Sequence, residues 1–354
     1  MIMTEGSARL KVEITGKVSK EMKVFYNPIM SLNRDVSVLL LNSINKGSMQ
    51  IADPLAASGV RSIRFLKELK RNKIRNISIN DIGKNSIISI KENLALSKIQ
   101  YKNNKKIKIF NEDANLFLLK SKGFDYIDID PFGSPNFLLN NAILRLARGG
   151  ILAVTATDTS ALCGTFPAAC MRKYWALPKK CAIMHEIGLR ILIRKVQLVA
   201  AQYDKALTPI FSYSKEHYMR AFLKNEKGKN KADEILKLHG NFNGSGPMWL
   251  GRLWDSGLCG EMRNNALKNK IFKKNYALVN FLKIATEESK IDAVGFYDLN
   301  DICKKSKIKR LQKKEAVKNK IKKLGCKASD THFRSEGIRS DIPLKKLVGL
   351  LKNK

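Results

Sequence analysis

The chain has 354 residues, of which 44% are hydrophobic and 27% are charged. This length predicts two domains, or one large domain with an appendage, and the composition excludes a wholly disordered chain. Lys and Arg number 66 against 31 Asp and Glu, which gives a formal net charge of +35. A charge of this size predicts a polyanionic partner, with nucleic acid ahead of a membrane surface.

The sequence shows no sign of export or of membrane insertion. The first residues include Glu5 and Glu13 and lack the apolar run of a signal peptide. No stretch approaches the roughly 18 apolar residues of a membrane span. The six cysteines form no CxxC pair, which argues against a disulfide framework and against a local zinc site. We therefore expect a cytoplasmic protein that is not bound to a membrane.

Short apolar runs alternate with helical stretches through the first half of the chain. A helix is predicted over 36–46. Strands that are followed by helical stretches are predicted over 49–53, 76–81, 107–113, 124–130 and 149–158. Strands separated by helices favour a parallel, doubly wound α/β sheet. A further helix is predicted around 186–203, and a strand pair over 208–214 and 217–225.

The character of the chain changes at the polar, charged segment 224–233, KNEKGKNKAD. This segment predicts a domain boundary, with a first domain over 1–231 and a second over 232–354. The second domain is basic, since eleven of the twenty residues over 304–323 are Lys or Arg. Two helices followed by a turn-rich hairpin resemble a winged-helix layout. The residues expected to face its small core are Leu299, Ile302, Ile308, Leu311, Val317, Ile321 and Leu324.

Acidic residues follow four of the predicted strands, at the sheet edge where open α/β sheets bind ligands. They are Asp53, Asp81, Asp113 and Asp130. The turn after the first strand offers only Gly59, which disfavours a cofactor with a pyrophosphate and favours S-adenosylmethionine. Asp81 could then accept both ribose hydroxyls, and Asp113 with the Ala114 backbone N–H could bind the adenine edge. The alternative is that each acid only caps a helix or completes a turn.

The sequence Asp130-Pro131-Phe132-Gly133 after the fourth strand is the candidate chemical centre. A carboxylate that accepts the N–H bond of a nucleobase amine makes the nitrogen a better nucleophile and can take its proton. The carbonyl of the stiff Pro131 could accept the second N–H. Phe132 could stack on a base that is flipped out of its helix. The alternative is an ordinary strand-to-helix turn, in which Pro and Gly are common.

With these motifs the sequence resembles the tRNA (guanine, N2)-dimethyltransferases that act at position 26. The matching segments are Glu5-Gly6, VFYNPIMSLNRD (24–35), ADPLAASGVRSIR (52–64), IDIDPFGSP (127–135), VTATDTSALCG (154–164), GPMWLGRLW (246–254) and ASDTHFRSEGIRSD (328–341). The resemblance implies a Rossmann-like class I methyltransferase sheet over 1–231, with a smaller C-terminal α+β, winged-helix-like domain that binds tRNA. It implies methyl transfer to the exocyclic N2 of guanine 26, giving N2-methylguanosine and then N2,N2-dimethylguanosine. We expect a monomer, although the sequence itself gives neither the oligomeric state nor the number of methyl groups added.

The resemblance also implies roles for individual residues. Asp130 would be the catalytic carboxylate, and Phe25 and Phe132 would line the pocket for the methyl group and the guanine. The residues that would contact S-adenosylmethionine are Arg34, Arg61, Asp81, Asp113 and Ala114. The alternatives are core packing for Phe25 and a surface ion pair with Asp35 for Arg34.

The chain departs from the family in one segment. Many members carry two cysteine pairs before the GPMWLG motif, but 235–251 contains no cysteine and only one histidine, His239. We therefore expect no bound metal. Two other functions remain open on the sequence alone. One is methylation of another nucleobase amine, such as adenine N6 or a different tRNA guanine. The other is RNA binding without catalysis.

Overall fold

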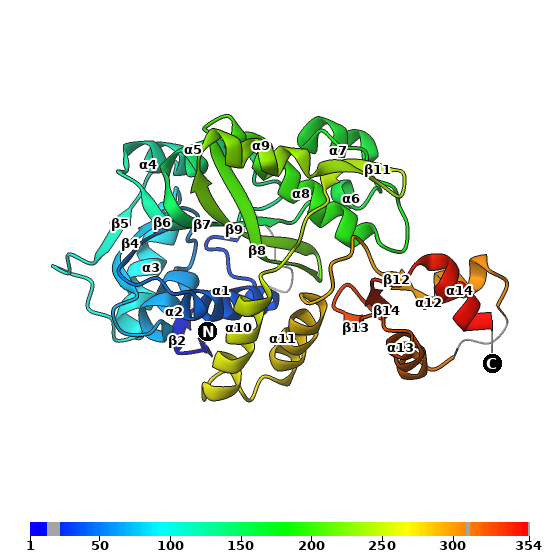
Figure 1. Ribbon diagram of the computed structural model, residues 1–354. Coiled ribbons are helices and arrows are strands. Elements are labelled where there is room, and N and C mark those ends of the chain that lie inside the picture. Colours follow the sequence, from blue (N-terminus) through cyan, green and yellow to red (C-terminus); the bar gives the residue numbers. More distant parts are fainter. Residues whose placement is uncertain (13–21, 309–311, 353–354) are drawn as a thin grey trace.

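A seven-stranded mixed sheet forms the centre of the computed structural model, which describes residues 1–12, 22–308 and 312–352 (Figure 1). The strand order is β5-β4-β3-β6-β7-β9-β8. The strands are β3 (Met49–Asp53), β4 (Ile74–Asn80), β5 (Ile107–Phe110), β6 (Phe124–Ile129), β7 (Leu146–Ala156), β8 (Lys205–Lys215) and β9 (Tyr218–Lys227). Strands β3 to β7 are parallel, which confirms the predicted α/β sheet. The strand pair predicted after them joins the same sheet as an antiparallel hairpin, β8–β9, at the β7 edge.

Helices cover both faces of this sheet (Figure 1). On one face lie α1 (Ser31–Ser43), α2 (Val60–Glu68), α3 (Lys84–Leu96) and α10 (Ser256–Lys268). On the other lie α4 (Ala114–Lys120), α5 (Asn136–Arg145), α8 (Met184–Ala201) and α9 (Lys229–Lys237). None of the helices in the described ranges has the length and apolarity to cross a membrane.

Several elements were not assigned residue ranges from the sequence, which predicts short helices over 232–354 only in general terms. They are the hairpins β1 (Ile2–Glu5)–β2 (Ala8–Lys11) and β10 (His239–Phe242)–β11 (Ser245–Trp249), the 3-10 turn η1 (Pro28–Met30), and the helices α6 (Thr159–Leu162), α7 (Pro167–Tyr174) and α11 (Tyr276–Glu288). The hairpin β1–β2 packs on α2 and α3, so the N-terminus lies against the helical layer next to the sheet. Its position brings Glu5 to Arg34 in the first turn of α1.

The C-terminal unit contains the predicted pair of helices and hairpin. Its elements are β12 (Tyr297–Asp298), α12 (Leu299–Lys305), α13 (Lys314–Lys323), β13 (Ala328–Thr331), β14 (Arg334–Ser340) and α14 (Leu344–Lys352). The strands form a small antiparallel sheet in the order β12-β14-β13. This arrangement of two helices followed by a hairpin agrees with the winged-helix-like layout expected from the sequence.

The C-terminal unit has a hydrophobic core of its own. Of the residues predicted there, Leu299, Ile302, Val317 and Ile321 are buried and Ile308 packs against them. Leu324 was predicted wrongly, since its side chain is 54% exposed. It would share the face of Val317 and Ile321 if α13 continued, but the helix ends at Lys323 and the chain turns away at Gly325, which has φ +78°. Leu311 lies outside the described residues.

The main hydrophobic core continues well beyond the predicted boundary at 231/232. It includes Met248, Trp249 and Phe281, and extends to Phe296, whereas the second core begins at Leu299. The helices α10 and α11 contribute to this main core, so they belong to the sheet domain and not to the C-terminal unit. The division into 1–231 and 232–354 stays a prediction, and the two cores favour a division close to 297.

A buried cluster of charges joins the C-terminal unit to the sheet domain. Arg339 on β14 contacts Glu186 on α8 at 2.6 Å and Glu288 at the end of α11 at 3.0 Å. It also donates to the carbonyls of Ala293 and Gly295, each at 2.9 Å. Burial alone would raise the pKa of Glu288, but the neighbouring His332 and Arg339 lower it to about 2. The junction is thus held by fully paired buried charges.

We expect Arg339→Ala to destabilise the protein by about 3 kcal/mol or more, because the buried Glu186 and Glu288 would each lose one of their two cationic partners. The measurement is thermal or urea unfolding followed by circular dichroism. Arg252→Ala is the matched control, since Arg252 pairs with Asp292 at the same junction, but both side chains are more than half exposed. Its cost should stay below about 1 kcal/mol. Equal effects of the two substitutions would contradict a structural role for the Arg339 cluster.

Candidate active site

A cavity of about 700 Å³ opens at the carboxyl ends of the central strands. Its volume falls within the range of small-molecule and cofactor sites, about 300–1,000 Å³. The predicted site residues that line it are Phe25, Arg34, Arg61, Asp81, Asp130, Pro131 and Phe132, and Asp53 lines it as well. The fold therefore brings most of the predicted residues together, from segments that are far apart in the sequence.

Asp113 and Ala114 do not line this cavity. The Asp113 carboxylate accepts hydrogen bonds from the backbone N–H groups of Asn115 at 2.9 Å and Leu116 at 3.1 Å, so it caps the start of α4. This is the alternative that the sequence left open for every strand-end acid. The adenine-binding role of these two residues stays a prediction.

Asp81 is the strand-end acid best placed to bind a ligand. Its side chain is partly exposed at the wall of the cavity, and its two oxygens accept the backbone N–H groups of Ala57 at 2.8 Å and Gly83 at 2.9 Å. A carboxylate offers about four lone-pair positions, so two remain for hydroxyl donors. Gly59 shapes the facing turn with φ +76°, a conformation that favours glycine.

Arg34 is held by an acid from the N-terminal hairpin. Its guanidinium contacts Glu5 at 2.6 and 2.5 Å and donates to the Asn27 carbonyl at 3.0 Å. The surface ion pair with Asp35 that the sequence allowed is not formed, because Asp35 pairs with Arg64 at 2.6 Å. Arg34 is only 5% exposed, yet it lines the cavity. Its guanidinium is therefore fixed at the cavity wall.

Asp130 belongs to a network of buried charges beneath the cavity. Arg61 on α2 contacts Asp130 through one nitrogen and Asp128 through the other, the latter at 3.2 Å. Arg220 on β9 reaches the same Asp128 from the other side at 2.7 and 2.9 Å. Burial would lower the pKa of Arg61, but the two carboxylates raise it above its ordinary value. The Asp130 carboxylate is thus oriented by a permanently charged partner.

The turn after Asp130 is tied to the next strand. The backbone N–H of Gly133 donates to the Thr157 hydroxyl at 2.6 Å, and the Thr157 N–H donates to the Gly133 carbonyl at 2.9 Å. The intervening Phe132 is 41% exposed. Its ring meets that of Phe25 edge-on, with centroids 4.3 Å apart. Phe25 is therefore part of the cavity wall, and the core packing that the sequence allowed for it does not describe its place.

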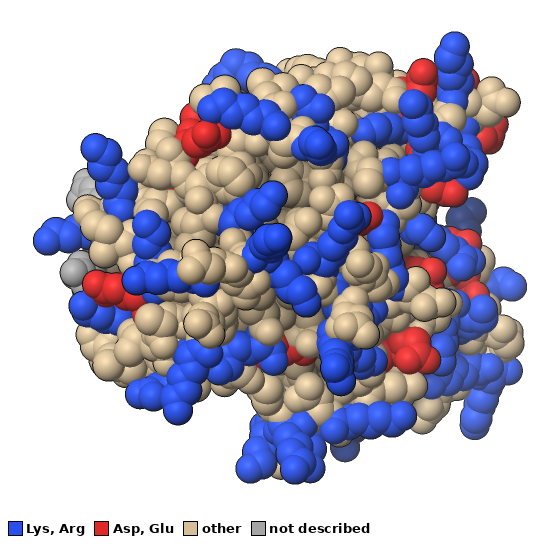
Figure 2. All heavy atoms as spheres, turned by 90° about the vertical axis from the view of Figure 1, so that its left-hand side faces the viewer, with Lys and Arg blue, Asp and Glu red and all other residues tan. Residues whose placement is uncertain are grey.

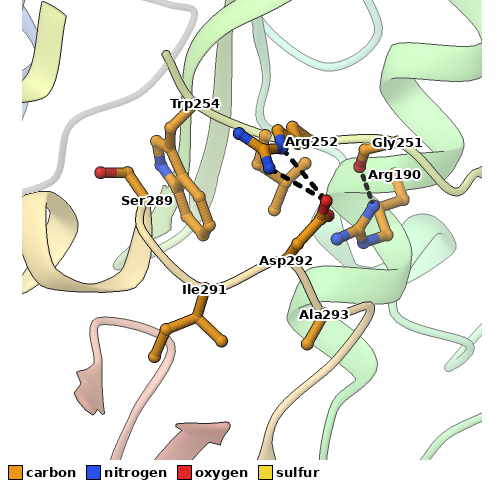
Figure 3. A pocket seen from close by; sticks show the side chains of 9 residues that line it. Arg190, Gly251, Arg252, Trp254, Ser289, Ile291, Asp292 and Ala293 are labelled. Atoms are coloured by element: carbon orange, nitrogen blue, oxygen red, sulfur yellow. Dashed lines mark hydrogen bonds and ion pairs between the residues drawn. The ribbon is translucent and has the colours of Figure 1, made fainter. Parts of the chain in front are cut away.

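A second cavity, shown in Figure 3, is too small for a substrate. It measures about 10 Å³, which is about the room that one water needs. It lies at the junction described above, where Arg190 donates to the Gly251 carbonyl at 2.8 Å and Arg252 pairs with Asp292 at 3.0 Å (Figure 3). Its lining is structural.

No metal site is apparent among the described residues, where no three His, Cys, Asp or Glu side chains are grouped to hold an ion. His239 packs beside Trp249, and its Nε2 lies 2.8 Å from the Gln197 side-chain oxygen. Burial and the nearby Arg194 lower the pKa of His239 to about 4, so it is neutral at physiological pH. Independence of metal stays a prediction.

Three functional contributors were missed by reasoning from the sequence. Asp128 could have been found, because it precedes Asp130 by two residues and therefore faces the same side of the strand. Arg220 gives no local signal, since it lies 92 residues after its partner Asp128. Glu5 stands in a segment that resembles the family, but nothing near it in the sequence indicates its partner Arg34.

Asp53 gives the site a pH dependence that can be measured. Burial raises its pKa to about 7, and the nearby Asp128 and Asp130 act in the same direction against Arg61. When folding raises the pKa of an acid, the protein loses stability as the pH rises from the pKa of that acid in the unfolded chain to its pKa in the folded protein. We therefore expect Asp53→Asn to gain in melting temperature relative to the wild type between pH 5 and about 7, and to gain no more above it. A melting-temperature difference that is independent of pH would contradict the assignment.

Comparison with known proteins agrees with this geometry. The chain matches the family described as N2,N2-dimethylguanosine tRNA methyltransferase over residues 6–242 and 234–352. It is 37% identical to the tRNA (guanine(26)-N(2)/guanine(27)-N(2))-dimethyltransferase of Aquifex aeolicus, with 98% of this chain and 94% of the relative covered. It is 35% identical to the tRNA (guanine(26)-N(2))-dimethyltransferase of Methanocaldococcus jannaschii, with 98% and 97% covered.

A solved structure gives the same result for the fold. The chain is similar over its whole length to Trm1 from Pyrococcus horikoshii in complex with S-adenosyl-L-methionine, with a TM-score of 0.89, 32% identity and full coverage of both chains. The fold, the strand-end cavity and the full-length similarity lead to one assignment: this chain belongs to the N2,N2-dimethylguanosine tRNA methyltransferase family.

Proposed function

We propose that this protein transfers methyl groups from S-adenosylmethionine to the exocyclic N2 of guanine 26 in tRNA, first giving N2-methylguanosine and then N2,N2-dimethylguanosine. The observation that carries the proposal is the meeting of Asp130, Pro131 and Phe132 with Arg34, Arg61 and Asp81 around one cavity. Near full-length relatives named for this reaction support it. A cytoplasmic location and a monomeric state stay predictions.

The residues of the cavity fit S-adenosylmethionine. Asp81 has free acceptor positions for ribose hydroxyls, and the fixed guanidinium of Arg34 suits a carboxylate. Arg61 reaches the cavity from α2, although its nitrogens also serve Asp128 and Asp130. When bound, the cofactor supplies an electrophilic methyl group.

The chemistry proposed for the chain itself concerns the guanine amine. The Asp130 carboxylate accepts one N–H of this amine, returns electron density to the nitrogen and takes its proton. The Pro131 carbonyl accepts the second N–H. The exposed Phe132 and its neighbour Phe25 hold the flipped base by aromatic contact. Arg61 and the two hydrogen bonds between Gly133 and Thr157 fix the turn, so positioning contributes much of the rate.

An unmodified tRNA transcript treated with the protein and S-adenosylmethionine should acquire N2,N2-dimethylguanosine at position 26. Asp130→Ala should lower turnover by at least about 100-fold while cofactor binding survives. Asp81→Ala should instead weaken cofactor binding first. The measurements are nucleoside mass analysis with position mapping, and calorimetric titration with S-adenosylmethionine.

The same experiment separates the other candidates. Guanine 27 is a second possible target, because the Aquifex aeolicus relative is named for guanines 26 and 27. Methylated adenosine in the product would show a different amine methyltransferase. A protein that binds tRNA and leaves it unmethylated would be an RNA-binding protein. Near-normal turnover by the Asp130→Ala variant would remove this residue from the centre.

The C-terminal unit is the proposed main contact for tRNA. Its exposed lysines include Lys304 and Lys307 at the end of α12, and Lys322 and Lys323 at the end of α13. Not every lysine of the basic block is available, because Lys314 and Lys318 both pair with Asp330 at 2.9 Å. Lys309 and Arg310, which also belong to the block, lie outside the described residues.

The sheet domain is basic as well, which makes a control essential. Figure 2 shows Lys and Arg side chains spread over the face at the left of Figure 1, with few acids among them. Structured RNA is bound largely through its phosphates and shape, so such a face could also contribute. The exposed Lys98, Lys102, Lys105 and Lys106 between α3 and β5 provide a set of equal charge on the sheet domain.

We expect reversal of Lys304, Lys307, Lys322 and Lys323 to Glu to weaken tRNA binding strongly and to flatten its dependence on salt, because fewer counterions are released on binding. Affinity for S-adenosylmethionine should stay unchanged. The control reverses the four lysines between α3 and β5 and should have a much smaller effect. The measurement is tRNA binding over a series of salt concentrations. If the control set has the larger effect, the main contact lies on the sheet domain.

A further inference from the structure

One tryptophan is exposed although the other two are buried. Trp249 and Trp254 are 3% and 5% exposed, whereas Trp175 is 48% exposed. Trp175 follows α7 directly, as its C-terminal cap. Met171 and Leu177, close to it in the sequence, are exposed as well, at 46% and 51%, and exposed apolar side chains that lie together often mark a binding surface.

The structure fixes this exposed ring in place. Trp175 has φ 55° and ψ 41°, a left-handed conformation that costs a non-glycine residue about 1–2 kcal/mol. Its N–H donates to the Met171 carbonyl at 3.0 Å, and its carbonyl accepts from Arg194 at 3.1 Å. The Lys195 ammonium lies 2.9 Å from the ring centroid, so one face of the ring is covered by a cation. An oriented aromatic ring therefore stands half in water.

Lys195 is suited to this supporting role. Its side chain is almost fully buried, at 6% exposure. Burial and the adjacent Arg194 lower its pKa to about 8, which leaves the ammonium charged at neutral pH. A cation over the face of Trp is a favourable contact worth about 0.5–2 kcal/mol. This contact limits the freedom of the ring before any ligand arrives.

Trp175 follows two residues that are hydrogen-bonded to segments bordering the large cavity. The preceding Tyr174 donates its hydroxyl to Asp158 at 2.6 Å, and the Lys173 carbonyl accepts from the Asn136 side chain at 2.7 Å. Asp158 directly follows Thr157, and Asn136 directly precedes Phe137. Both Thr157 and Phe137 line the cavity. The end of α7 is thus attached to both segments that border the proposed guanine site.

The segment of the chain that contains Trp175 is basic. Between Met171 and Lys180 the sequence contains Arg172, Lys173, Lys179 and Lys180 and no acid, and all four basic side chains are exposed. An aromatic ring among exposed cations is the combination by which proteins bind unpaired nucleotides, with the base on the ring and the phosphates on the cations.

We propose that Trp175 stacks on an unpaired base of the tRNA next to the target guanine, and that Arg172 and Lys179 contact the adjoining phosphates. This inference rests on the proposed function, because it takes tRNA as the substrate. Trp175 is then a specificity and affinity contact, separate from the residues that take part in methyl transfer.

The first test uses tryptophan fluorescence, since only Trp175 among the three is substantially exposed. Binding of unmodified tRNA should quench part of the tryptophan emission. It should also make the emission of Trp175 that remains less accessible to quenching by acrylamide. Trp175→Phe should abolish both changes while it keeps most of the tRNA affinity, because a phenyl ring still stacks. Unchanged acrylamide accessibility on tRNA binding by the wild type would overturn the inference.

The second test uses Trp175→Gly, which suits the backbone since glycine adopts positive φ without cost. Its melting temperature should stay close to that of the wild type, because relief of the positive φ offsets the loss of the Lys195 contact. Its KM for tRNA should rise on the order of tenfold, with kcat at saturating tRNA unchanged, because the stacked base is lost. The control is Leu116→Ala, which truncates an exposed apolar side chain elsewhere, on α4. It should change neither the KM for tRNA nor kcat.

The outcomes separate this inference from the proposed function. Wild-type KM in the Trp175→Gly variant, with methylation intact, would overturn the stacking contact and leave the proposed function standing. A wild-type protein that neither binds nor methylates tRNA would overturn both. A fall in kcat without a change in KM would place Trp175 in the chemistry and would also overturn the inference.

Discussion

Two carboxylates at the end of β6, Asp128 within the strand and Asp130 directly after it, set the main constraint of this structure. Side chains alternate along β6, so Asp128 and Asp130 face the same side and would repel each other in a buried site. Arg61 lies between them and contacts both, and Arg220 neutralises Asp128 from β9. Arg220 also donates to Thr155 on β7 at 2.7 Å. A single electrostatic requirement therefore fixes α2, β6, β7 and β9 relative to one another, and with them the carboxylate at the cavity.

The part of the site that follows from local sequence could be predicted. Each short apolar run that ends in an acid is a parallel strand, and β3 coincides with the predicted residues 49–53. The spacing to the next helix decides what each acid does. The helix after β5 begins at Ala114, so Asp113 must cap it, whereas the helix after β4 begins only at Lys84, which leaves Asp81 facing the cavity.

The part that depends on distant segments could not be predicted. Glu5 meets Arg34 only because the hairpin β1–β2 packs on α2 and α3, and no pattern near residue 5 indicates that packing. Arg339 likewise gives no sign in the sequence that Glu186 lies beside it. The net charge also does not tell where a partner binds. The excess of Lys and Arg predicts a polyanionic partner, but it is spread over both units and does not indicate which face of the protein contacts it.

The late position of β9 in the chain has a consequence for synthesis on the ribosome. Asp128 emerges 92 residues before Arg220. A nascent chain that ends before β9 leaves β7, with its apolar run Ile151–Val154, as the open edge of the sheet. Such edges pair readily with other chains and lead to aggregation. The hairpin β8–β9 covers this edge and supplies Arg220 to Asp128 in the same step, so a fragment that stops short of Arg220 has both an unpaired sheet edge and a buried carboxylate that lacks its second cation.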